Sequence, residues 1–477
     1  MTGDLPRHEL LSQGRAVLDW IAEYLEHPEH YPVLSEMKPG EVLASLPAVP
    51  PNRGEPLEEI LEDFRTKIVP GITHWNHPSF FAYFATSSSV PGILAEMLTA
   101  TLDVKAMLWR TSPAATELEQ LVTDWLRQML GLGDGWFGMT TDTASMSSML
   151  ALAAAREARP ELAIRERGMA GRTDLPRLRV YASEHAHSSI DKAALALGLG
   201  LENVVHIASD DDFRMKPDAL AAAIAEDRQR GFLPMACVAT VGTTSTSSVD
   251  PVPRIAEICR RESLWLHVDG AYGGVLAIVP ENRYLLDGVD GADSLVVNPH
   301  KWLFTPFDCS VFYVKKPEIL KRAFSLVPEY LVTREQDSVV NYMDYGVQLG
   351  RRFRALKLWM VIRAYGVDGL VERLREHRAI AERLAGWIES TPDWELAAPV
   401  PFSLVCFRYS PTGVGPTELD RLNEAIMHAV NASGEMFISH TKLSGRFTLR
   451  LSIGNIRTDE GHVAAAWDRL QASVRSL

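Results

Sequence analysis

The middle of the chain alternates short apolar runs with longer segments of helical periodicity. The apolar runs have the length and composition of buried strands, and they cover residues 177–183, 203–209, 236–242, 264–270, 293–298 and 309–314. Segments with apolar residues at helical spacing lie between them, at 187–198, 216–231 and 251–263. Strands and helices that alternate in this way are typical of a mostly parallel sheet with helices on both faces. The pattern predicts an α/β fold.

The two ends of the chain differ from this middle part. Helical periodicity interrupted by proline fills residues 16–32 and 55–72 without a strand pattern, and this segment could not bury its apolar face alone. After a long helical stretch from Leu356, strand-like and helical segments mix up to the last residues. We therefore expect a helical N-terminal dimerisation segment over 1–85, a large α/β domain over 86–360 and a small α+β domain over 361–477.

Composition and charge indicate which classes of binding partner the protein is expected to have. Hydrophobic residues make up 46% of the chain and charged residues 23%, as in an ordinary globular protein. The formal net charge of −13 predicts an acidic surface that repels phosphate backbones and anionic lipid, so we expect neither a nucleic-acid nor a membrane partner. The first residues lack the basic and apolar pattern of a leader, and no apolar run is long enough to cross a bilayer. We expect a cytoplasmic protein.

Metal binding is not expected from the cysteines and histidines. The four cysteines lie far apart, form no metal-type pair and are expected to be buried thiols: Cys237, Cys259, Cys309 and Cys406. His185 and His187 form an H-x-H pair, but no third ligand accompanies them at a convincing spacing. Just past a strand end, His187 is better placed to lie over a planar ring. A helix-capping loop with an incidental imidazole is the alternative.

Polar residues stand directly after three of the predicted strands. Asp269 ends one apolar run, Thr244 belongs to a hydroxyl cluster after another, and Asn298, His300 and Lys301 follow a third. In open α/β sheets, ligands bind outside the carboxyl ends of the strands. These positions are therefore the first candidates for a site.

The sequence around Lys301 allows two interpretations of this residue. Its methylene stem can run along the core and leave the ammonium in water. Alternatively, a desolvated amine has a lowered pKa and can form a Schiff base with a carbonyl. Asp269, 32 residues earlier at the end of another strand, favours the second interpretation. Pyridoxal 5'-phosphate (PLP) needs such a lysine, and it needs a carboxylate that keeps its ring nitrogen protonated.

The segment 138–157 offers a seat for the phosphate of this cofactor. A hydroxyl-rich turn runs there into an alanine-rich helix, whose unpaired N–H groups and dipole attract anions. By itself, such a helix start is typical of an ordinary N-cap. Together with Asp269 and Lys301 it supports a PLP site.

Several motifs together carry a resemblance to a known family. They are THWNHP at 73–78, HPSFFAYFATSSSVPGIL at 77–94, HAHSS at 185–189, HVDGAYGG at 267–274, NPHKW at 298–302 and LGRRFRALKLW at 349–359. In this order, across nearly the whole chain, they resemble the group II pyridoxal-phosphate-dependent amino-acid decarboxylases. The aromatic-L-amino-acid decarboxylase branch is the most similar.

The resemblance implies a fold, an assembly and a reaction. The fold is type I of the PLP-dependent enzymes, similar to aspartate aminotransferase. The assembly is a homodimer with the active site at the subunit interface and the N-terminal segment packed across the partner. The reaction is a PLP-dependent carboxy-lyase reaction, which converts an aromatic L-amino acid of the tryptophan, phenylalanine, tyrosine or dihydroxyphenylalanine class to its arylalkylamine and CO2.

The resemblance also implies roles for individual residues. Lys301 would hold the cofactor, Asp269 its ring nitrogen, and His187 would stack on the ring. Other positions that match cofactor contacts are Ala144, Ser145, Thr244, Asn298 and His300. Positions that match the substrate pocket are Trp75, Tyr83, Phe84 and Thr86, with Lys105 and Met107 in a segment that the partner subunit contributes. Taken singly, the aromatic residues are equally typical of an ordinary core.

The polar segment 328–342 is expected to be a lid that closes over the substrate and excludes water. By resemblance, Tyr330 in this segment protonates Cα after CO2 has left. Relatives with tyrosine at this position resemble decarboxylases, and relatives with phenylalanine resemble aldehyde synthases, which consume oxygen. Tyr330 and His187 both favour plain decarboxylation.

Two positions depart from the family pattern. Lys105 stands where animal aromatic decarboxylases are apolar, and pointing to solvent is an equally good interpretation of it. Gln348 replaces the small residues that sort indolic from phenolic substrates in plant relatives. The preferred aromatic amino acid is therefore left open.

Three other functions compete with this prediction. An aldehyde synthase on the same scaffold would form aldehyde, ammonia and peroxide instead of amine. A decarboxylase of an acidic amino acid is disfavoured by the aromatic block at 74–84. A non-catalytic binding protein would have no reason to keep Lys301, Asp269, His187 and Tyr330 together.

Overall fold

The computed structural model describes residues 4–326, 335 and 338–475. The chain forms two compact units. The large unit spans Thr86–Ser390 and Leu396–Phe407, and the terminal unit spans Met1–Ala85, Thr391–Glu395 and Arg408–Leu477. The division into three parts at residues 85 and 360 stays a prediction.

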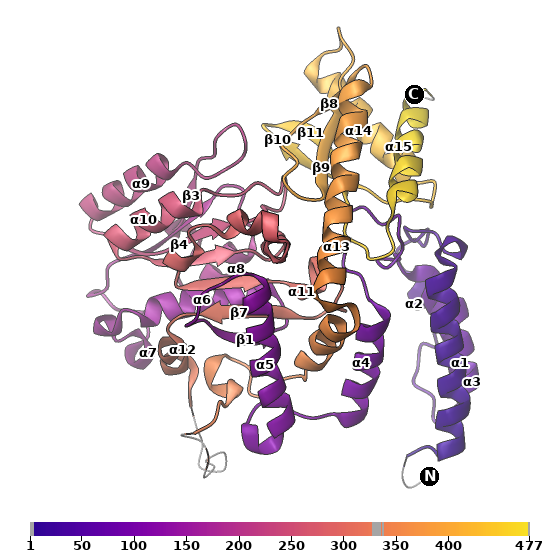
Figure 1. The fold of residues 1–477 in the computed structure, drawn as a ribbon, viewed down its shortest axis with the longest axis horizontal. Helices are drawn as coiled ribbons and strands as arrows, with labels where there is room; N and C mark the ends of the chain where they lie inside the picture. Colours follow the sequence, from indigo (N-terminus) through magenta and orange to yellow (C-terminus); the bar gives the residue numbers. More distant parts are fainter. Residues whose placement is uncertain (1–3, 327–334, 336–337, 476–477) are drawn as a thin grey trace. The chain divides into compact units, whose positions relative to one another are not determined.

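A seven-stranded sheet runs through the large unit (Figure 1). In spatial order its strands are β1 (Phe137–Thr141), β7 (Ser310–Val314), β6 (Ser294–Val297), β5 (Trp265–Asp269), β4 (Leu233–Thr240), β2 (Leu178–Ser183) and β3 (Val204–Ile207). Neighbouring strands are parallel, except that β7 is antiparallel to both β1 and β6. The mostly parallel sheet expected from the sequence is confirmed.

Helices surround this sheet (Figure 1). They are α4 (Val90–Leu102), α5 (Pro113–Met129), α6 (Ala144–Glu157), α7 (Ile164–Arg167), α8 (Ser189–Ala196), α9 (Pro217–Gln229), α10 (Val252–Glu262), α11 (Pro299–Trp302), α12 (Pro317–Phe324) and α13 (Ala355–Ser390). The long α13 is interrupted at Gly366, whose φ of 67° lies in the left-handed region. Glycine adopts this conformation without the steric cost of a Cβ atom.

The alternation of side chains along the strands assigns helices to both faces of the sheet. Phe312 of β7 belongs to an apolar core with α6, α8 and α12. The next residue, Tyr313, donates its hydroxyl to the carbonyl oxygen of Thr123 on α5 at 2.7 Å. On β4, Cys237 is likewise hydrogen-bonded with Cys259 of α10. Successive side chains of a strand point to opposite faces, so α6 and α8 cover one face while α5 and α10 cover the other.

The terminal unit combines N-terminal helices with an antiparallel sheet. Its helices are α1 (Arg7–Glu26), α2 (Glu41–Ser45), α3 (Leu57–Asp63), α14 (Pro416–Asn431) and α15 (Glu460–Arg475). The sheet has the order β10 (Ser439–Leu443), β11 (Arg446–Ser452), β9 (Leu404–Tyr409) and β8 (Trp394–Leu396), and β8 and β9 cross the boundary between the units. The small antiparallel sheet agrees with the α+β character expected near the C-terminus.

Two further sequence expectations can be compared with the structure. All four cysteines are buried and none of them forms a disulfide, which confirms them as buried thiols. Within the part of the chain that the structure describes, no helix combines the length and the apolar character that a bilayer crossing would need.

Candidate active site

The register of β4, β5 and β6 brings Asp269 and Lys301 to one edge of the sheet. Thr240 pairs with Asp269, and Asp269 pairs with Val296, so these three parallel strands end side by side. Asp269 is the last residue of β5, and Lys301 lies on the short helix α11 that follows β6. Neighbouring strands lie about 4.8 Å apart, so groups at their ends can share one ligand.

Burial changes the acid–base character of Lys301. Desolvation lowers the pKa of its amine from the usual range, and the negative charge of Asp269 opposes this shift. Its chain neighbours His300 and Trp302 are buried. An amine with a lowered pKa spends more time unprotonated at neutral pH, and this is the form that attacks a carbonyl. The environment favours a nucleophile over a lysine that extends its charge into water.

Asp269 is buried and held by the backbone. The residue is 5% exposed, and Oδ1 accepts the N–H of Ala271 at 3.0 Å. Small residues follow it, and a Cβ atom added at Gly270 would come within 3.1 Å of the carbonyl oxygen of Val296. The carboxylate therefore has a fixed direction beside a tightly packed backbone.

The start of α6 lies at the same edge. Ala144, the first residue of α6, forms one buried apolar cluster with Ala271 and Val296. Ala271 lies two residues after Asp269, and Val296 belongs to β6. The helix is capped by Thr143, whose hydroxyl accepts the N–H of Met146 at 3.5 Å. Ser145 is exposed. The structure thus brings the predicted phosphate seat together with the ends of β5 and β6.

His187 stands in electrostatic contact with both charged groups. Desolvation lowers the pKa of its imidazole, Asp269 raises it, and Lys301 lowers it further. Its Nδ1 accepts the N–H of Ser189 at 3.1 Å, so the neutral ring carries its proton on Nε2. The other histidine of the pair, His185, packs edge-on against Phe213 at 5.4 Å between ring centroids. Of these two histidines, His187 is therefore the one that interacts with Asp269 and Lys301.

Asn298 and His300 flank Lys301 in different ways. Asn298 is 2% exposed, and its Oδ1 is buried without a hydrogen-bond partner among the described residues. His300 is also buried, and its Nδ1 accepts the N–H of Cys309 at 2.9 Å. Burial lowers the pKa of His300 to about 3, so its ring is neutral. His300 fixes the backbone beside Lys301, while Asn298 keeps a free acceptor.

Thr244 lies in the loop after β4, on top of a network of hydroxyl groups. Thr246 bonds to Thr243 at 3.0 Å and to Ser248 at 2.8 Å, and all three are buried. Thr244 itself is exposed. The network fixes the loop and leaves the side chain of Thr244 at its surface.

Three predicted substrate-pocket residues belong to the large unit. Thr86 is partly buried, and Lys105 is exposed in the single chain. Met107 packs on Leu108 and Met343. The exposure of Lys105 is compatible with both interpretations, the solvent-facing one and the contribution to a partner's pocket.

The aromatic residues predicted for the substrate pocket belong to the terminal unit. Trp75 stacks on Phe80 at 4.5 Å and on Tyr83 at 5.6 Å between centroids, and both Trp75 and Tyr83 are exposed. Phe84 is mostly buried, with Arg450 over its ring at 5.7 Å. Tyr330 and most of the predicted lid lie outside the described residues.

A buried ion pair behind β1 was not predicted from the sequence. Arg351 donates to both carboxylate oxygens of Glu119, at 2.6 and 3.1 Å, and to the carbonyl oxygens of Thr140 and Ala106. Glu119 also accepts the N–H of Thr140 at 2.7 Å. The pair therefore holds the strand that leads into α6 and the segment that contains Lys105. Arg351 belongs to the motif at 349–359, but Glu119 lies 232 residues away in the sequence, so local pattern does not predict the pair.

The residues at this edge fit PLP. The site offers a desolvated amine, a buried carboxylate, a helix N-terminus for the phosphate and a buried amide oxygen, Asn298 Oδ1, that lacks a partner. The charges of Asp269 and Lys301 also shift the pKa of the His187 imidazole. No other cofactor is needed to explain this combination of amine, acid and anion seat.

Comparisons with known proteins agree with the geometry. The model of the pyridoxal-dependent decarboxylase conserved domain matches residues 39–410. Tyrosine decarboxylase 2 of Arabidopsis thaliana is 42% identical over 476 residues, covering 97% of this chain and 86% of the relative. Phenylacetaldehyde synthase of Arabidopsis thaliana is 40% identical over 479 residues, covering 98% and 96%.

A solved structure is similar along its entire length. The crystal structure of Oryza sativa TDC with PLP and tryptamine has a TM-score of 0.96 and 35% identity, covering 100% of this chain and 99% of that one. The type I fold and the PLP cofactor implied by the motifs are thereby confirmed, and the protein is a PLP-dependent carboxy-lyase. By its fold, its desolvated lysine and buried acid, and a match over most of its length, the chain belongs to the pyridoxal-dependent decarboxylase family.

Proposed function

We propose that the protein decarboxylates an aromatic L-amino acid to the corresponding arylalkylamine and CO2. The observation that carries this proposal is the desolvated Lys301 amine beside the buried carboxylate of Asp269. The aromatic character of the substrate is supported by relatives that are named for tyrosine and for phenylacetaldehyde, and by a similar structure with tryptamine.

Each residue of the site has a task in this reaction. Lys301 would hold the aldehyde carbon of the cofactor, and Asp269 would keep the proton on its ring nitrogen. The N–H groups at Ala144 and Ser145 would hold the phosphate, because the first N–H groups of a helix have no intrahelical partner. When bound, the protonated ring of the cofactor accepts the electron pair of the bond that breaks at Cα.

The neighbours of these groups position them. His187 would lie over the ring, and its Nδ1, fixed by the N–H of Ser189, sets the direction of the imidazole plane. Asn298 would use its unpartnered amide oxygen, and Thr244 and His300 complete the set of cofactor contacts that we propose from the family motifs.

Proton return to Cα is assigned to Tyr330 on the basis of the sequence. A phenol placed over Cα can donate the proton that replaces CO2, and a lid that excludes water prevents side reactions. We also keep Trp75, Tyr83, Phe84, Thr86, Lys105 and Met107 as proposed substrate-binding residues. The stacked and exposed rings of Trp75 and Tyr83 have the character that an aromatic ligand needs.

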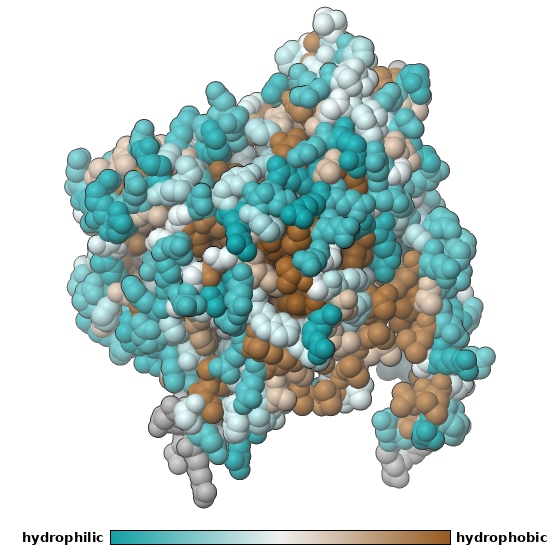
Figure 2. All heavy atoms as spheres, in the orientation of Figure 1, coloured by the Kyte–Doolittle hydropathy of each residue, from teal (hydrophilic) through white to brown (hydrophobic). Residues whose placement is uncertain are grey.

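A homodimer is supported by the apolar surface of α4. Its exposed large apolar residues recur at helical spacing: Val90, Leu94, Met97, Leu98 and Leu102, with 41–57% exposure. Figure 2 shows apolar atoms gathered in the area that α4 occupies in Figure 1. None of the residues of α1 is buried, although Leu10, Leu11 and Leu18 lie on it. Such surfaces mark interaction sites. We also propose a cytoplasmic location, which suits four cysteines that form no disulfide.

One experiment tests reaction and substrate together. The purified holoenzyme is incubated in air with tryptophan, phenylalanine, tyrosine and dihydroxyphenylalanine, and amines and aldehydes are quantified by mass spectrometry. Amine from at least one of these substrates is expected. No amine and no aldehyde from any of them, with glutamate decarboxylated instead, would overturn the aromatic assignment.

The second candidate is an aldehyde synthase on the same scaffold. It is favoured by the 40% identity to phenylacetaldehyde synthase over almost the entire chain. It predicts aldehyde with peroxide and ammonia, so the same incubation separates it from plain decarboxylation.

A further inference from the structure

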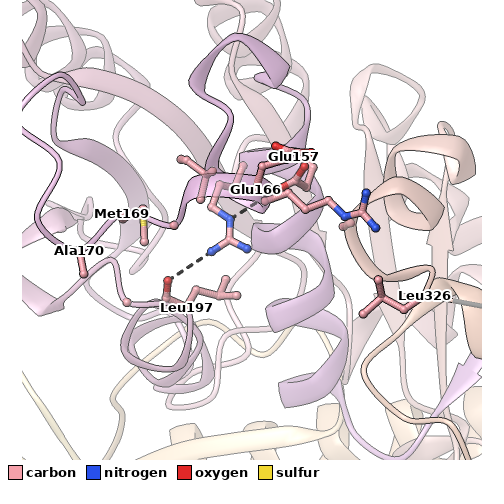
Figure 3. A pocket seen from close by; sticks show the side chains of 12 residues that line it. Glu157, Glu166, Met169, Ala170, Leu197 and Leu326 are labelled. Carbon is pink, nitrogen blue, oxygen red and sulfur yellow. Dashed lines mark hydrogen bonds and ion pairs between the residues drawn. The ribbon is translucent and has the colours of Figure 1, made fainter.

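A pocket lies in the large unit at the C-terminal end of α6. It has a volume of about 930 Å³ and lies between the end of α6, α7, the loop that follows α7, the end of α8 and α12. We call it the α6–α7 pocket. Figure 3 shows Glu157 and Glu166 above it, Met169 and Ala170 on one side, Leu326 on the other and Leu197 below. Its volume is in the range that binds small molecules.

The pocket is separate from the proposed active site. The cofactor seat is at the N-terminus of α6 (Ala144), and the pocket is at its C-terminus (Glu157). A helix of this length spans about 20 Å, at 1.5 Å per residue. The decarboxylation proposed above uses none of the residues of the pocket.

A guanidinium in the pocket has an unused donor. Arg156 donates from one terminal nitrogen to the carbonyl oxygen of Leu197 at 3.3 Å. Its Nε is buried and has no hydrogen-bond partner among the described residues, and the nearest carboxylate oxygen, on Glu157, is 3.9 Å away. That separation is too long for a hydrogen bond. A buried charged donor without an acceptor is costly, so an acceptor is missing here.

A carboxylate in the same pocket, on Glu157, accepts no hydrogen bond from the residues that the structure describes. The side chain of Glu157 is only 7% exposed, and Arg156 reaches it only at 3.9 Å. The second arginine of the pocket, Arg165, donates instead to the carbonyl oxygen of Ser325 at 2.9 Å. Burial raises the pKa of Glu157, and the charges of Arg156, Arg322 and Arg165 oppose this shift without cancelling it. A cationic donor would satisfy it.

The remaining walls are apolar, and the charges balance. Arg156 and Arg165 face Glu157 and Glu166, so the pocket has no net charge. Apolar surface comes from Ile164, Met169, Leu197 and Leu326. A ligand that meets all of these groups carries one anionic and one cationic group close together on an apolar body. We infer that the α6–α7 pocket is a second binding site for a zwitterionic α-amino acid with an apolar side chain, with its carboxylate on Arg156 and its ammonium on Glu157.

The test must keep the ligand out of the active site. Holoenzyme is treated with phenylhydrazine, which condenses with the cofactor carbonyl and blocks the decarboxylase site, and residual activity is checked to be absent. L-Phenylalanine is then titrated into the blocked enzyme by isothermal calorimetry. We expect one equivalent to bind per chain. Phenethylamine lacks the carboxylate and 3-phenylpropionate lacks the ammonium, so each should bind at least about tenfold more weakly.

Variants of the pocket residues test whether L-phenylalanine binds in the α6–α7 pocket. Glu157→Gln keeps the shape and removes the charge, so it should weaken L-phenylalanine binding about tenfold or more. Glu161→Gln, an exposed glutamate just outside the pocket, is the matched control and should leave binding unchanged. If Glu157→Gln fails to fold, as judged by circular dichroism, Ala170→Trp decides, because it fills the pocket from an exposed position without removing a buried charge.

The outcomes are separable from the failure of the proposed function, because the blocked enzyme reports binding alone. No heat of binding in the blocked wild type would overturn the inference. So would equal affinity for phenethylamine and L-phenylalanine, which would point to an amine site, or unchanged binding in both Glu157→Gln and Ala170→Trp.

Discussion

At the scale of single residues, the site depends on one amine. Because Lys301 is the group whose pKa is lowered by burial beside Asp269, Lys301→Ala should lose the visible absorbance of the bound cofactor and lower kcat by about 1,000-fold or more. Absorbance spectra and steady-state kinetics measure both effects. Lys216→Ala, at an exposed lysine of the large unit, should behave as wild type. Turnover at the wild-type rate without Lys301 would refute its role.

Tyr330 decides between two products. If its phenol returns the proton to Cα, Tyr330→Phe removes the donor and leaves the reacting carbon open to oxygen. We expect amine yield to fall and aldehyde to rise in air, with both quantified by mass spectrometry. Under nitrogen the aldehyde should disappear. An unchanged amine yield in air without any aldehyde would show that another group donates the proton.

Buried neutral histidines make stability dependent on pH. Burial lowers the pKa of His267 to about 4, and the same cause lowers that of His77 to about 4 and of His300 to about 3. The unfolded chain has histidine pKa values near 6.5, so it takes up protons between about pH 6.5 and 4 that the folded chain does not. The stability contributed by each neutral histidine is present above about pH 6.5 and is lost as the pH falls through this window.

The expected change is large enough to measure. For each of these histidines, the unfolding free energy should be about 2 kcal/mol lower at pH 5 than at pH 7. Urea unfolding at both values gives the total. His267→Gln removes one of the groups, so its stability should fall less steeply with decreasing pH than that of the wild type. Parallel pH profiles of the two proteins would contradict this account.

At the scale of elements, the pair Glu119 and Arg351 ties α5 to β1 and to the segment before α13. Both side chains are nearly inaccessible, with 1% and 4% exposure. Removal of one partner leaves a buried charge without compensation, so Glu119→Gln or Arg351→Met should each lower the unfolding free energy by about 3–5 kcal/mol. Urea unfolding measures this, and cofactor affinity should fall as well, because β1 leads into the phosphate seat at α6.

A double variant separates the pair from the packing around it. Glu119→Leu with Arg351→Met removes both charges, so it should be less destabilised than either single variant. The exposed pair of Arg375 and Glu281, which is also bidentate, is the matched control. Arg375→Met should leave the unfolding free energy nearly unchanged. Additive losses in the double variant would show that the two charges do not interact.

The same scale shows how far the sequence could predict the structure. Strands that are mostly apolar and buried at every position, such as β5 and β6, follow from local pattern, and so do the polar residues at their ends. In both cases the strand signal and the site signal lie in one short segment. The local pattern does not predict the strand β1, because FGMTT contains glycine and two threonines. It forms a strand by pairing with β7, which lies 169 to 177 residues later in the chain. The polar strand β10 (SHTKL) depends in the same way on β11.

At the scale of the whole molecule, long-range contact limits what a sequence reveals. The terminal unit joins the first 85 residues to Thr391–Glu395 and Arg408–Leu477. No periodicity within these segments predicts their association. The partners of the Lys301 site could be predicted because the carboxyl ends of parallel strands always meet at one edge. Neither the partner of Arg351 nor the α6–α7 pocket could be predicted from the sequence, because both depend on which helices pack together.

The exposed face of α4 gives the last prediction, which concerns assembly. A monomer would leave Leu94 and Leu98 in water on adjacent turns, at 42% and 49% exposure, whereas a homodimer can bury them. Leu94→Glu with Leu98→Glu would place two like charges in that interface, so the variant should elute as a monomer in size-exclusion chromatography with light scattering. It should also lose decarboxylase activity, because the proposed pocket takes a segment from the partner. Leu195→Glu changes an exposed leucine on α8, outside this face, and should stay dimeric and active. A dimeric and active α4 variant would place the assembly surface elsewhere.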